Sequence, residues 1–114
     1  MAGLYGPDRH PARFLSGKKN LKNGDAPVNL IHRDDCIAII SQIIEGTISG
    51  EIFNCCSDGH PSRKEFYTKA SIVAKLPPPH FLEENTFSFK IVSNKKLKQK
   101  LNYSFIHPDP MTSI

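Results

Sequence analysis

The sequence has 114 residues, of which 39% are hydrophobic, and its formal net charge is +4 at pH 7. This length allows one domain at most, with a small core. No run of about eighteen apolar residues is present, and the first residues lack the basic-then-apolar layout of a secretory signal. We therefore expect no membrane-spanning helix and a cytoplasmic location.

The mildly basic charge is a weak sign of nucleic-acid binding. Lysine and arginine total 15 against 11 acidic residues, and the lysines gather at Lys18–Lys19 and between Lys90 and Lys100. Nucleic-acid binders place basic residues on one face, and those that hold single strands add aromatic residues. No aromatic residue lies between Lys90 and Lys100. We interpret these lysines as a solvated face and rank nucleic acid last among the possible partners.

The three cysteines, Cys36, Cys55 and Cys56, limit the redox chemistry. An odd number with an adjacent pair makes a poor disulfide framework, because neighbouring cysteines bridge each other only with strain. The Cys-x-x-Cys spacing typical of zinc sites is absent. We expect no disulfide and no metal site, and at least one of Cys55 and Cys56 as a small buried apolar residue.

The first predicted elements follow a segment rich in glycine and proline. This segment, residues 1–27, predicts a long loop region, and residues 28–32 predict a short strand. Asp34 or Asp35 can cap the next helix, because a carboxylate accepts free backbone N–H groups at the positive end of the helix dipole. We expect this helix over about residues 36–45, with its stop at position 46, a glycine. Its apolar face is Ile37, Ile40, Ile43 and Ile44.

A second strand and helix follow. Residues 51–56 predict a strand, and Ser62 with Glu65 forms a capping box for a helix that extends to about residue 75. The apolar stripe of this helix is Phe66, Ala70, Val73 and Ala74. Three prolines at 77–79 end it.

A third predicted strand and helix complete the alternation of strands and helices along the chain. Residues 87–92 predict a strand, and Ser93 can cap a helix through Leu101, with Leu97 and Leu101 pointing inward. Residues 107–114 are expected to be irregular. Alternating strands and helices indicate an α/β fold, or α+β for an isolated piece. Three short strands are too few for a parallel sheet with both faces covered, so the chain should need something else to pack against.

Five segments together carry a resemblance to a known family: GLYGPDRHPARFL, NLIHRDD, IFNCCSD, PSRKEFY and VSNKKL, in this order. They resemble the C-terminal half of an extended short-chain dehydrogenase/reductase, of the atypical NAD-dependent epimerase/dehydratase branch. The resemblance covers Ala2 to about Pro110. It implies that residues 1–27 cover an active site, that residues 28–110 form a substrate-binding region and that residues 111–114 are a tail.

The same resemblance implies a Rossmann domain before this region in the complete enzyme, which transfers a hydride with NAD or NADP. This sequence carries neither signature of that chemistry. Its seven glycines show no Gly-x-Gly-x-x-Gly spacing, and no tyrosine has a lysine four residues further on. We therefore expect the Rossmann domain to be absent, no catalytic residue, and no cofactor for the chain alone. Its expected partners are a Rossmann half in the same or a separate chain, a small-molecule substrate and a second copy of the chain.

The resemblance also assigns a position near the cofactor. Leu4, Tyr5 and Gly6 correspond to backbone that passes close to the nicotinamide and the substrate in relatives, and we expect a cofactor-binding role for them. A strand end followed by a turn is the alternative interpretation. Asp8 stands where many relatives have glycine, which alters the expected conformation of this loop.

Substrate-binding candidates come from the loop that follows. Arg9, His10 and Arg13 lie where the family covers its active site, and an arginine there could hold a carboxylate or phosphate through two hydrogen bonds. Solvated surface residues are the alternative interpretation for all three.

The second motif departs from the pattern of sugar-nucleotide enzymes. These members often open it with an arginine that binds the diphosphate, and Val28 stands at that position. This departure counts against a nucleotide-diphosphate sugar as substrate. Asn29 is the polar residue of this strand that could face the substrate. His32 is expected to be structural, bonding to backbone or to Asp35 and ordering the turn.

A non-catalytic protein is the second hypothesis. A short binding module would dock on a separate partner or self-associate through uncovered apolar faces. Such a module would expose an apolar patch larger than the few hundred Å² that monomers usually show. A compact monomer that does not associate would contradict it.

Overall fold

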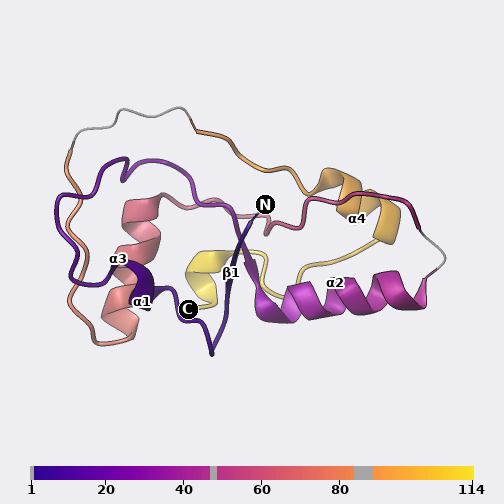
Figure 1. The fold of residues 1–114 in the computed structure, drawn as a ribbon, viewed down its shortest axis with the longest axis horizontal. Helices are drawn as coiled ribbons and strands as arrows, with labels where there is room; N and C mark the ends of the chain where they lie inside the picture. Colours follow the sequence, from indigo (N-terminus) through magenta and orange to yellow (C-terminus); the bar gives the residue numbers. More distant parts are fainter. Residues whose placement is uncertain (1, 47–48, 84–88) are drawn as a thin grey trace.

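Two short parallel strands lie at the centre of the fold (Figure 1). The structure is a computed structural model that describes residues 2–46, 49–83 and 89–114. Strand β1 (Gly3–Tyr5) pairs with strand β2 (Leu30–His32). With helices on either side of these strands, the fold is α/β, as the sequence predicted.

Helices make up most of the remaining regular structure. The described part of the chain contains α1 (Ala12–Leu15), α2 (Arg33–Glu45), α3 (Arg63–Val73), α4 (Lys95–Leu101) and the 3-10 helix η1 (Pro110–Thr112). Figure 1 shows α2 and α3 extending to opposite sides of the strands along the long axis of the molecule. The molecule measures 47 × 30 × 18 Å, so its thin direction leaves little room to cover every face. No helix in the described ranges has the length and apolarity needed to cross a bilayer.

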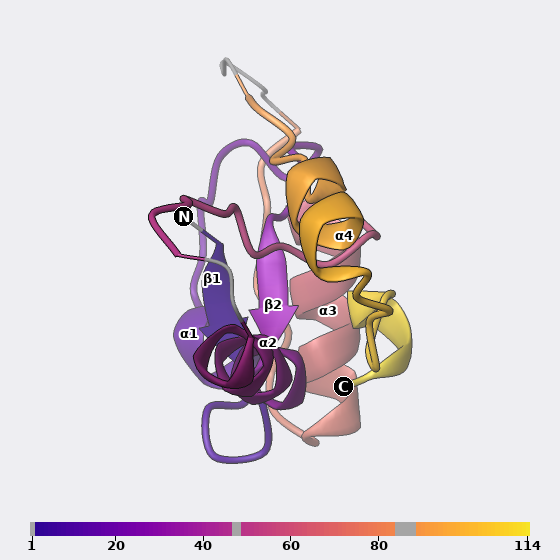
Figure 2. The same ribbon diagram turned by 90° about the vertical axis from the view of Figure 1, so that its right-hand side faces the viewer.

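The strand pair separates two small hydrophobic cores. Because side chains alternate along a strand, Leu30 and Ile31 point to opposite faces. One core is Tyr5, Val28, Leu30 and Phe66, which brings α3 against the strands. The other is Ile31, Ile39, Leu97 and Leu101, which joins β2 to α2 and α4. Figure 2 shows α3 and α4 beside β2, whereas one edge of β1 has no neighbouring strand.

Helix α2 begins earlier than the sequence predicted. It starts at Arg33, and its cap is His32, whose Nδ1 accepts a hydrogen bond from the backbone N–H of Asp34. The prediction that Asp34 or Asp35 caps the helix is therefore wrong, because both residues lie in its first turn. The expected backbone role of His32 is confirmed. Gly46 is the C-cap, as predicted.

The cap of α3 agrees with the prediction, and that of α4 agrees in part. The Ser62 hydroxyl accepts the backbone N–H of Glu65, and α3 ends at Val73, two residues before its predicted end. The N-cap of α4 is Asn94 and not the predicted Ser93, although the Ser93 hydroxyl accepts the backbone N–H of Lys95, the first residue of the helix. The prediction that Leu97 and Leu101 point inward is confirmed, since both are buried.

Two predicted strands do not form in the described residues. Residues 51–56 pair with no strand, although Ser57 donates its N–H to the Leu30 carbonyl at 2.7 Å. For the predicted strand 87–92, residues 87–88 lie outside the described part, and residues 89–92 are not in a strand. Both runs have the composition of strands, but a strand also needs a partner with a free edge.

The cysteines behave as expected for free thiols. None of the three forms a disulfide among the described residues. Cys56 is completely buried, which confirms that one member of the adjacent pair is a small buried residue. Cys36 and Cys55 are half-buried.

The apolar face of α2 is largely uncovered. Ile37, Ile40 and Ile44 are 56%, 51% and 76% exposed, whereas Ile39, which lies outside the predicted face, is 1% exposed. The predicted apolar face is therefore not the buried one, because Ile43 packs with Ile39 at the core, whereas the other three isoleucines are exposed. On α3, Val73 is likewise 48% exposed.

We predict that Phe66→Ala lowers the free energy of unfolding by about 3 to 5 kcal/mol, because the ring is fully buried between α3 and the strands. Urea denaturation followed by circular dichroism measures this loss. Ile72→Ala is the matched control on the same helix, since Ile72 is 65% exposed and its removal should cost less than about 1 kcal/mol. Equal losses for the two variants would contradict the core assignment.

Candidate functional site

The carboxyl ends of the two strands lie side by side. Tyr5 ends β1 and His32 ends β2, and their rings meet edge to face with centroids 5.1 Å apart. Both side chains are buried. In open α/β sheets, ligands bind outside the carboxyl ends of the strands. This end of the strand pair is therefore the first place to look for a functional site.

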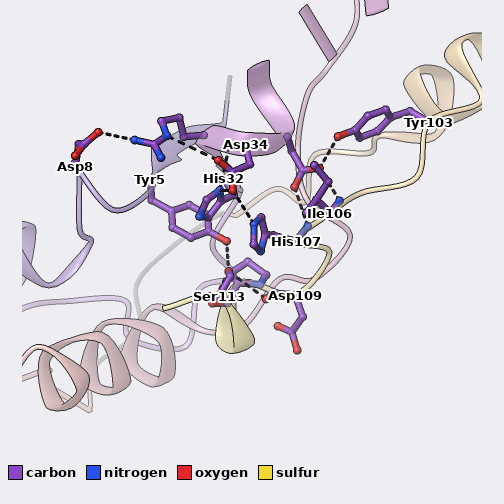
Figure 3. Close-up of polar contacts among 12 residues, drawn as sticks. Tyr5, Asp8, His32, Asp34, Tyr103, Ile106, His107, Asp109 and Ser113 are labelled. Carbon is purple, nitrogen blue, oxygen red and sulfur yellow. Dashed lines mark hydrogen bonds and ion pairs between the residues drawn. The ribbon is translucent and has the colours of Figure 1, made fainter. Parts of the chain in front are cut away.

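A segment from the far end of the sequence covers this place. We call residues 103–114 the C-terminal strap. The Asp35 carboxylate, fully buried in α2, accepts hydrogen bonds from the Tyr103 hydroxyl at 2.6 Å and from the N–H groups of Ile106 at 2.7 Å and His107 at 2.9 Å (Figure 3). Three donors satisfy a charge that would otherwise be costly to bury. Burial, and secondly the bond to Asp35, raises the pKa of Tyr103.

Two histidines meet where the strap crosses β2. The rings of His32 and His107 lie against each other, with centroids 3.9 Å apart (Figure 3). His107 Nε2 lies 3.1 Å from Asp34 Oδ2. This hydrogen bond lowers the pKa of Asp34 below its usual range. Burial, and secondly the neighbouring His107, lowers the pKa of His32.

These three side chains could in principle hold a metal ion. His32, Asp34 and His107 each offer one ligand atom, and these atoms lie within 4.8 Å of one another. However, His32 Nδ1 already accepts the N–H that caps α2, and the Asp34 oxygen already bonds to His107. A metal would have to displace both bonds. The arrangement is better described as a hydrogen-bonded network that joins the strap to the strands.

The strap also covers Tyr5. The Tyr5 hydroxyl forms a hydrogen bond of 2.5 Å with the Ser113 hydroxyl, and burial raises the pKa of the phenol. Met111 and Ile114 pack against the core that contains Tyr5. The prediction that residues 107–114 are irregular is therefore wrong in part. They include η1, whose Pro110 is fully buried.

The residues predicted to approach a cofactor follow the end of β1. Leu4 is 43% exposed at the open edge, and its carbonyl accepts a hydrogen bond from Arg9 Nε at 3.1 Å. Gly6 lies so close to α2 that a Cβ there would be 3.0 Å from the Cβ of Arg33. The Arg33 guanidinium in turn bonds to Asp8 at 2.5 Å. The turn after β1 is therefore held against the start of α2.

The four substrate-binding candidates do not form one cluster. The Arg9 guanidinium lies over the Phe14 ring at 4.9 Å, and His10 Nδ1 accepts the N–H of Ala12. Arg13 is exposed on α1.

Asn29 lies apart from this loop, and its side-chain amide is engaged. The oxygen accepts the Val92 N–H at 2.8 Å, and the nitrogen donates to the Lys90 carbonyl at 2.9 Å. This amide therefore holds residues 90–92 beside β2 in the place of a strand.

An apolar groove lies beside β1, over the face of the strand pair that carries Leu4 and Ile31. It has a volume of about 400 Å³ and is lined mainly by Ala2, Leu4, Ile31, Cys36, Ile40 and Phe53. Cys55 also lines it, and burial raises the pKa of this thiol. The groove is continuous with the exposed isoleucines of α2 through Ile40. Its apolar lining is typical of a surface that packs against another part of a protein.

Comparisons by sequence find relatives but no family model. No known family model matches the chain. The protein named YeeZ is 35% identical to it over 112 residues, both in Escherichia coli strain K12 and in Escherichia coli O157:H7. The match covers 97% of this chain but 40% of YeeZ. The chain thus spans less than half the length of the curated relatives it matches.

Comparisons by structure identify the fold. A functionally unknown conserved protein from Silicibacter pomeroyi DSS matches with a TM-score of 0.79 at 21% identity, over 99% of this chain and 45% of that one. The UDP-N-acetylglucosamine 4-epimerase from Bacillus cereus matches with a TM-score of 0.70 at 14% identity, over 98% of this chain and 43% of that one. The chain has the fold of a piece of a Rossmann-like epimerase.

We predict that Asp35→Asn lowers the free energy of unfolding by about 2 to 4 kcal/mol, because an amide cannot accept all three donors of the strap. Urea denaturation measures the loss, and hydrogen exchange at Ile106 and His107 locates it. Asp8→Asn is the control, since its ion pair with Arg33 is exposed and should contribute less than about 1 kcal/mol. A loss no larger than that of the control would refute the role of Asp35.

Proposed function

We propose that this chain is the substrate-binding C-terminal portion of an NAD(P)-dependent epimerase/dehydratase or reductase. The main support is that 98% of the chain superposes on a 43% portion of an epimerase. The motifs that begin at Gly3 and Asn29 agree with this assignment, because each coincides with one of the two parallel strands. In this reading the complete protein transfers a hydride between a nicotinamide cofactor and a small carbonyl or hydroxyl substrate.

The loop after β1 is where this chain would meet the ligands. Leu4 and Tyr5 end β1, Gly6 begins the turn that follows, and Gly6 is buried against Arg33 at the start of α2. The backbone is the group proposed to line the nicotinamide, since the Tyr5 side chain is buried against the strap. Arg9, which is exposed, and His10, which is half-buried, follow in this loop.

The substrate would be an anion or a polar small molecule that these basic residues can bind. Arg13 is free to turn toward it from α1, whereas Asn29 would reach a substrate only by giving up its two backbone bonds. Val28 in place of an arginine argues against a nucleotide-diphosphate sugar. This chain would therefore differ in substrate from the epimerase whose fold it shares.

NAD or NADP would be held mainly by another part of the protein. The chain offers the cofactor a backbone turn at Gly6 but no glycine-rich loop for the pyrophosphate and no Tyr-x-x-x-Lys pair. When bound, the cofactor supplies the hydride chemistry. The chain alone is expected to be inactive. Its free thiols agree with the reducing conditions of the cytoplasm, which we propose as its location.

The open side of the fold supports docking of a Rossmann half. Leu4 and the apolar groove lie beside β1, whose outer edge is unpaired, and Ile37, Ile40 and Ile44 extend the apolar surface along α2. A further parallel strand could pair with β1, and a helix after it could cover α2. The curated relatives contain the additional length needed, since the match covers 40% of YeeZ.

We predict that this chain, co-expressed with the part of YeeZ that it does not match, co-elutes with it in size-exclusion chromatography and that the complex binds NADH or NADPH. Ile40→Glu should weaken the complex about tenfold or more, because it places a charge in the apolar groove. Ile72→Glu is the control, since this exposed residue lies on α3.

The matched segment of YeeZ serves as the positive control for complex formation. If that segment binds and this chain does not, the proposed docking is wrong. If the complex forms but binds neither dinucleotide, the docking stands and the enzymatic function fails.

A binding module without catalysis is the second candidate, favoured by the same exposed isoleucines. It would self-associate through α2 or dock on a separate partner. Self-association should then give a dimer by light scattering, which Ile44→Glu disrupts, because Ile44 is 76% exposed at the end of the uncovered face. An intact mass of the native product near 114 residues would favour this module, whereas a mass near the length of YeeZ would favour the enzyme.

A further inference from the structure

We propose that His32 and His107 form a proton-sensitive latch that fastens the end of the C-terminal strap over the carboxyl ends of β1 and β2 and releases it in mildly acidic solution. The latch consists of the two stacked rings, the helix cap made by His32 and the bond between His107 and Asp34. The proposal concerns this chain's own residues and does not depend on the proposed enzymatic function.

The helix cap requires a neutral His32. Its Nδ1 accepts the Asp34 backbone N–H at 3.0 Å, and Nδ1 has a free lone pair only when the proton sits on Nε2. The side chain is 6% exposed, so water cannot readily replace this bond. Protonation of His32 would remove the cap of α2 and place a positive charge in a buried site.

The close contact between the His32 and His107 rings disfavours a positive charge on both of them. The ring centroids lie 3.9 Å apart with planes inclined by 33°. The Asp34 carboxylate, 3.1 Å from His107 Nε2, can balance one positive charge on the ring pair. A further proton on His32 would then face a cation at contact distance. The strap therefore stays in place with one charged ring but not with two.

The surroundings of His32 would compensate a positive charge only in part, because the Asp34 carboxylate lies 3.6 Å from Nδ1 but is shared with His107. The titratable and charged groups that face it are Tyr5 from β1, Arg33, Asp34 and Asp35 from α2, and His107 from the strap. Of the two carboxylates, Asp34 is engaged with His107, and Asp35 already accepts three donors from the strap. The positive Arg33 adds to the cost of a charge on His32.

The pH window follows from the sign of the shift. Burial and His107 lower the pKa of His32 in the folded state. A histidine of this kind stabilises the closed strap above its unfolded pKa of about 6.5 and loses that contribution as the pH falls toward the folded value. Release is therefore expected below about pH 6.5, not above it.

Release would be confined to one part of the strap. The backbone bonds from Ile106 and His107 to Asp35 do not involve either imidazole, so they can persist. Beyond them, η1 is joined to the histidine pair through Tyr5, whose ring packs on His32 and whose hydroxyl bonds to Ser113. It is also held by Met111 on the core, by the Lys69 ammonium on the Met111 carbonyl and by the Gly59 N–H on the Pro108 carbonyl. Movement of this part would uncover Tyr5 and the carboxyl ends of the strands, where ligands of α/β sheets bind.

Amide hydrogen exchange measured by NMR between pH 7.5 and 5.5, corrected for the intrinsic exchange rate, tests the latch in the 114-residue chain. The amides of Met111, Thr112 and Ser113 should lose protection by up to about tenfold, which is the most that one histidine with an unfolded pKa of about 6.5 can contribute at pH 5.5. The amides of Ile106 and His107 should keep theirs. Unchanged protection of Met111 to Ser113 would overturn the proposal.

Two variants distinguish release of the latch from a general loss of stability in acid. His107→Phe keeps a ring over His32 without a charge, and His32→Asn keeps a capping residue that does not titrate. Each should abolish the pH response of the 111–113 amides. His80→Asn, which removes an exposed histidine, should leave the response intact. A response of the same size in His107→Phe as in the parent would refute the role of the ring pair.

Imidazole NMR gives one measurement on the parent chain and a second on His107→Phe. His32 in the parent chain should carry its proton on Nε2 at neutral pH, because Nδ1 accepts the capping bond. Its pKa should rise in His107→Phe, where the neighbouring charge is absent. A proton on Nδ1 of His32 at neutral pH would contradict the latch directly.

Discussion

The arrangement of the whole site depends on the buried carboxylate of Asp35. A fully buried anion requires donors, and the strap supplies them from Tyr103, Ile106 and His107. These bonds place His107 against His32, and the chain that follows then reaches Tyr5. The first turn of α2 therefore fixes where the last residues of the described chain lie. Apolar contacts fill the two small cores, but this charge determines how the strap is attached.

The strand pair has two boundaries, its carboxyl end and the outer edge of β1, and they differ in what lies against them. Its carboxyl end is closed by the strap, with polar bonds to Tyr5 and to the start of α2. The outer edge of β1 is open and borders an apolar groove that continues onto α2. Polar bonds suit a contact that can exchange with water or ligand, whereas an apolar groove suits a permanent interface. We therefore propose the first boundary as a ligand site and the second as a contact within a larger protein.

Local features of the fold could be predicted from the sequence, and distant ones could not. The Ser62 cap and the inward leucines of α4 followed from short patterns in the chain. The strand over 51–56 was predicted wrongly, because alternation describes a segment but not its partner. His32 as a cap was missed, since the neighbouring aspartates are more usual in that role. No local signal links Asp35 to Tyr103, which are 68 residues apart.

The distance between Asp35 and its donors also affects synthesis of the chain. At about 5–20 residues per second, roughly 3 to 14 seconds separate translation of Asp35 from that of Tyr103, 68 residues later. During this interval the carboxylate has none of its three partners and must remain hydrated. Helix α2 can form, but it cannot be buried in its final position. Ribosome-bound chains that end before Tyr103 should therefore present a wet, incompletely packed α2 to chaperones and proteases.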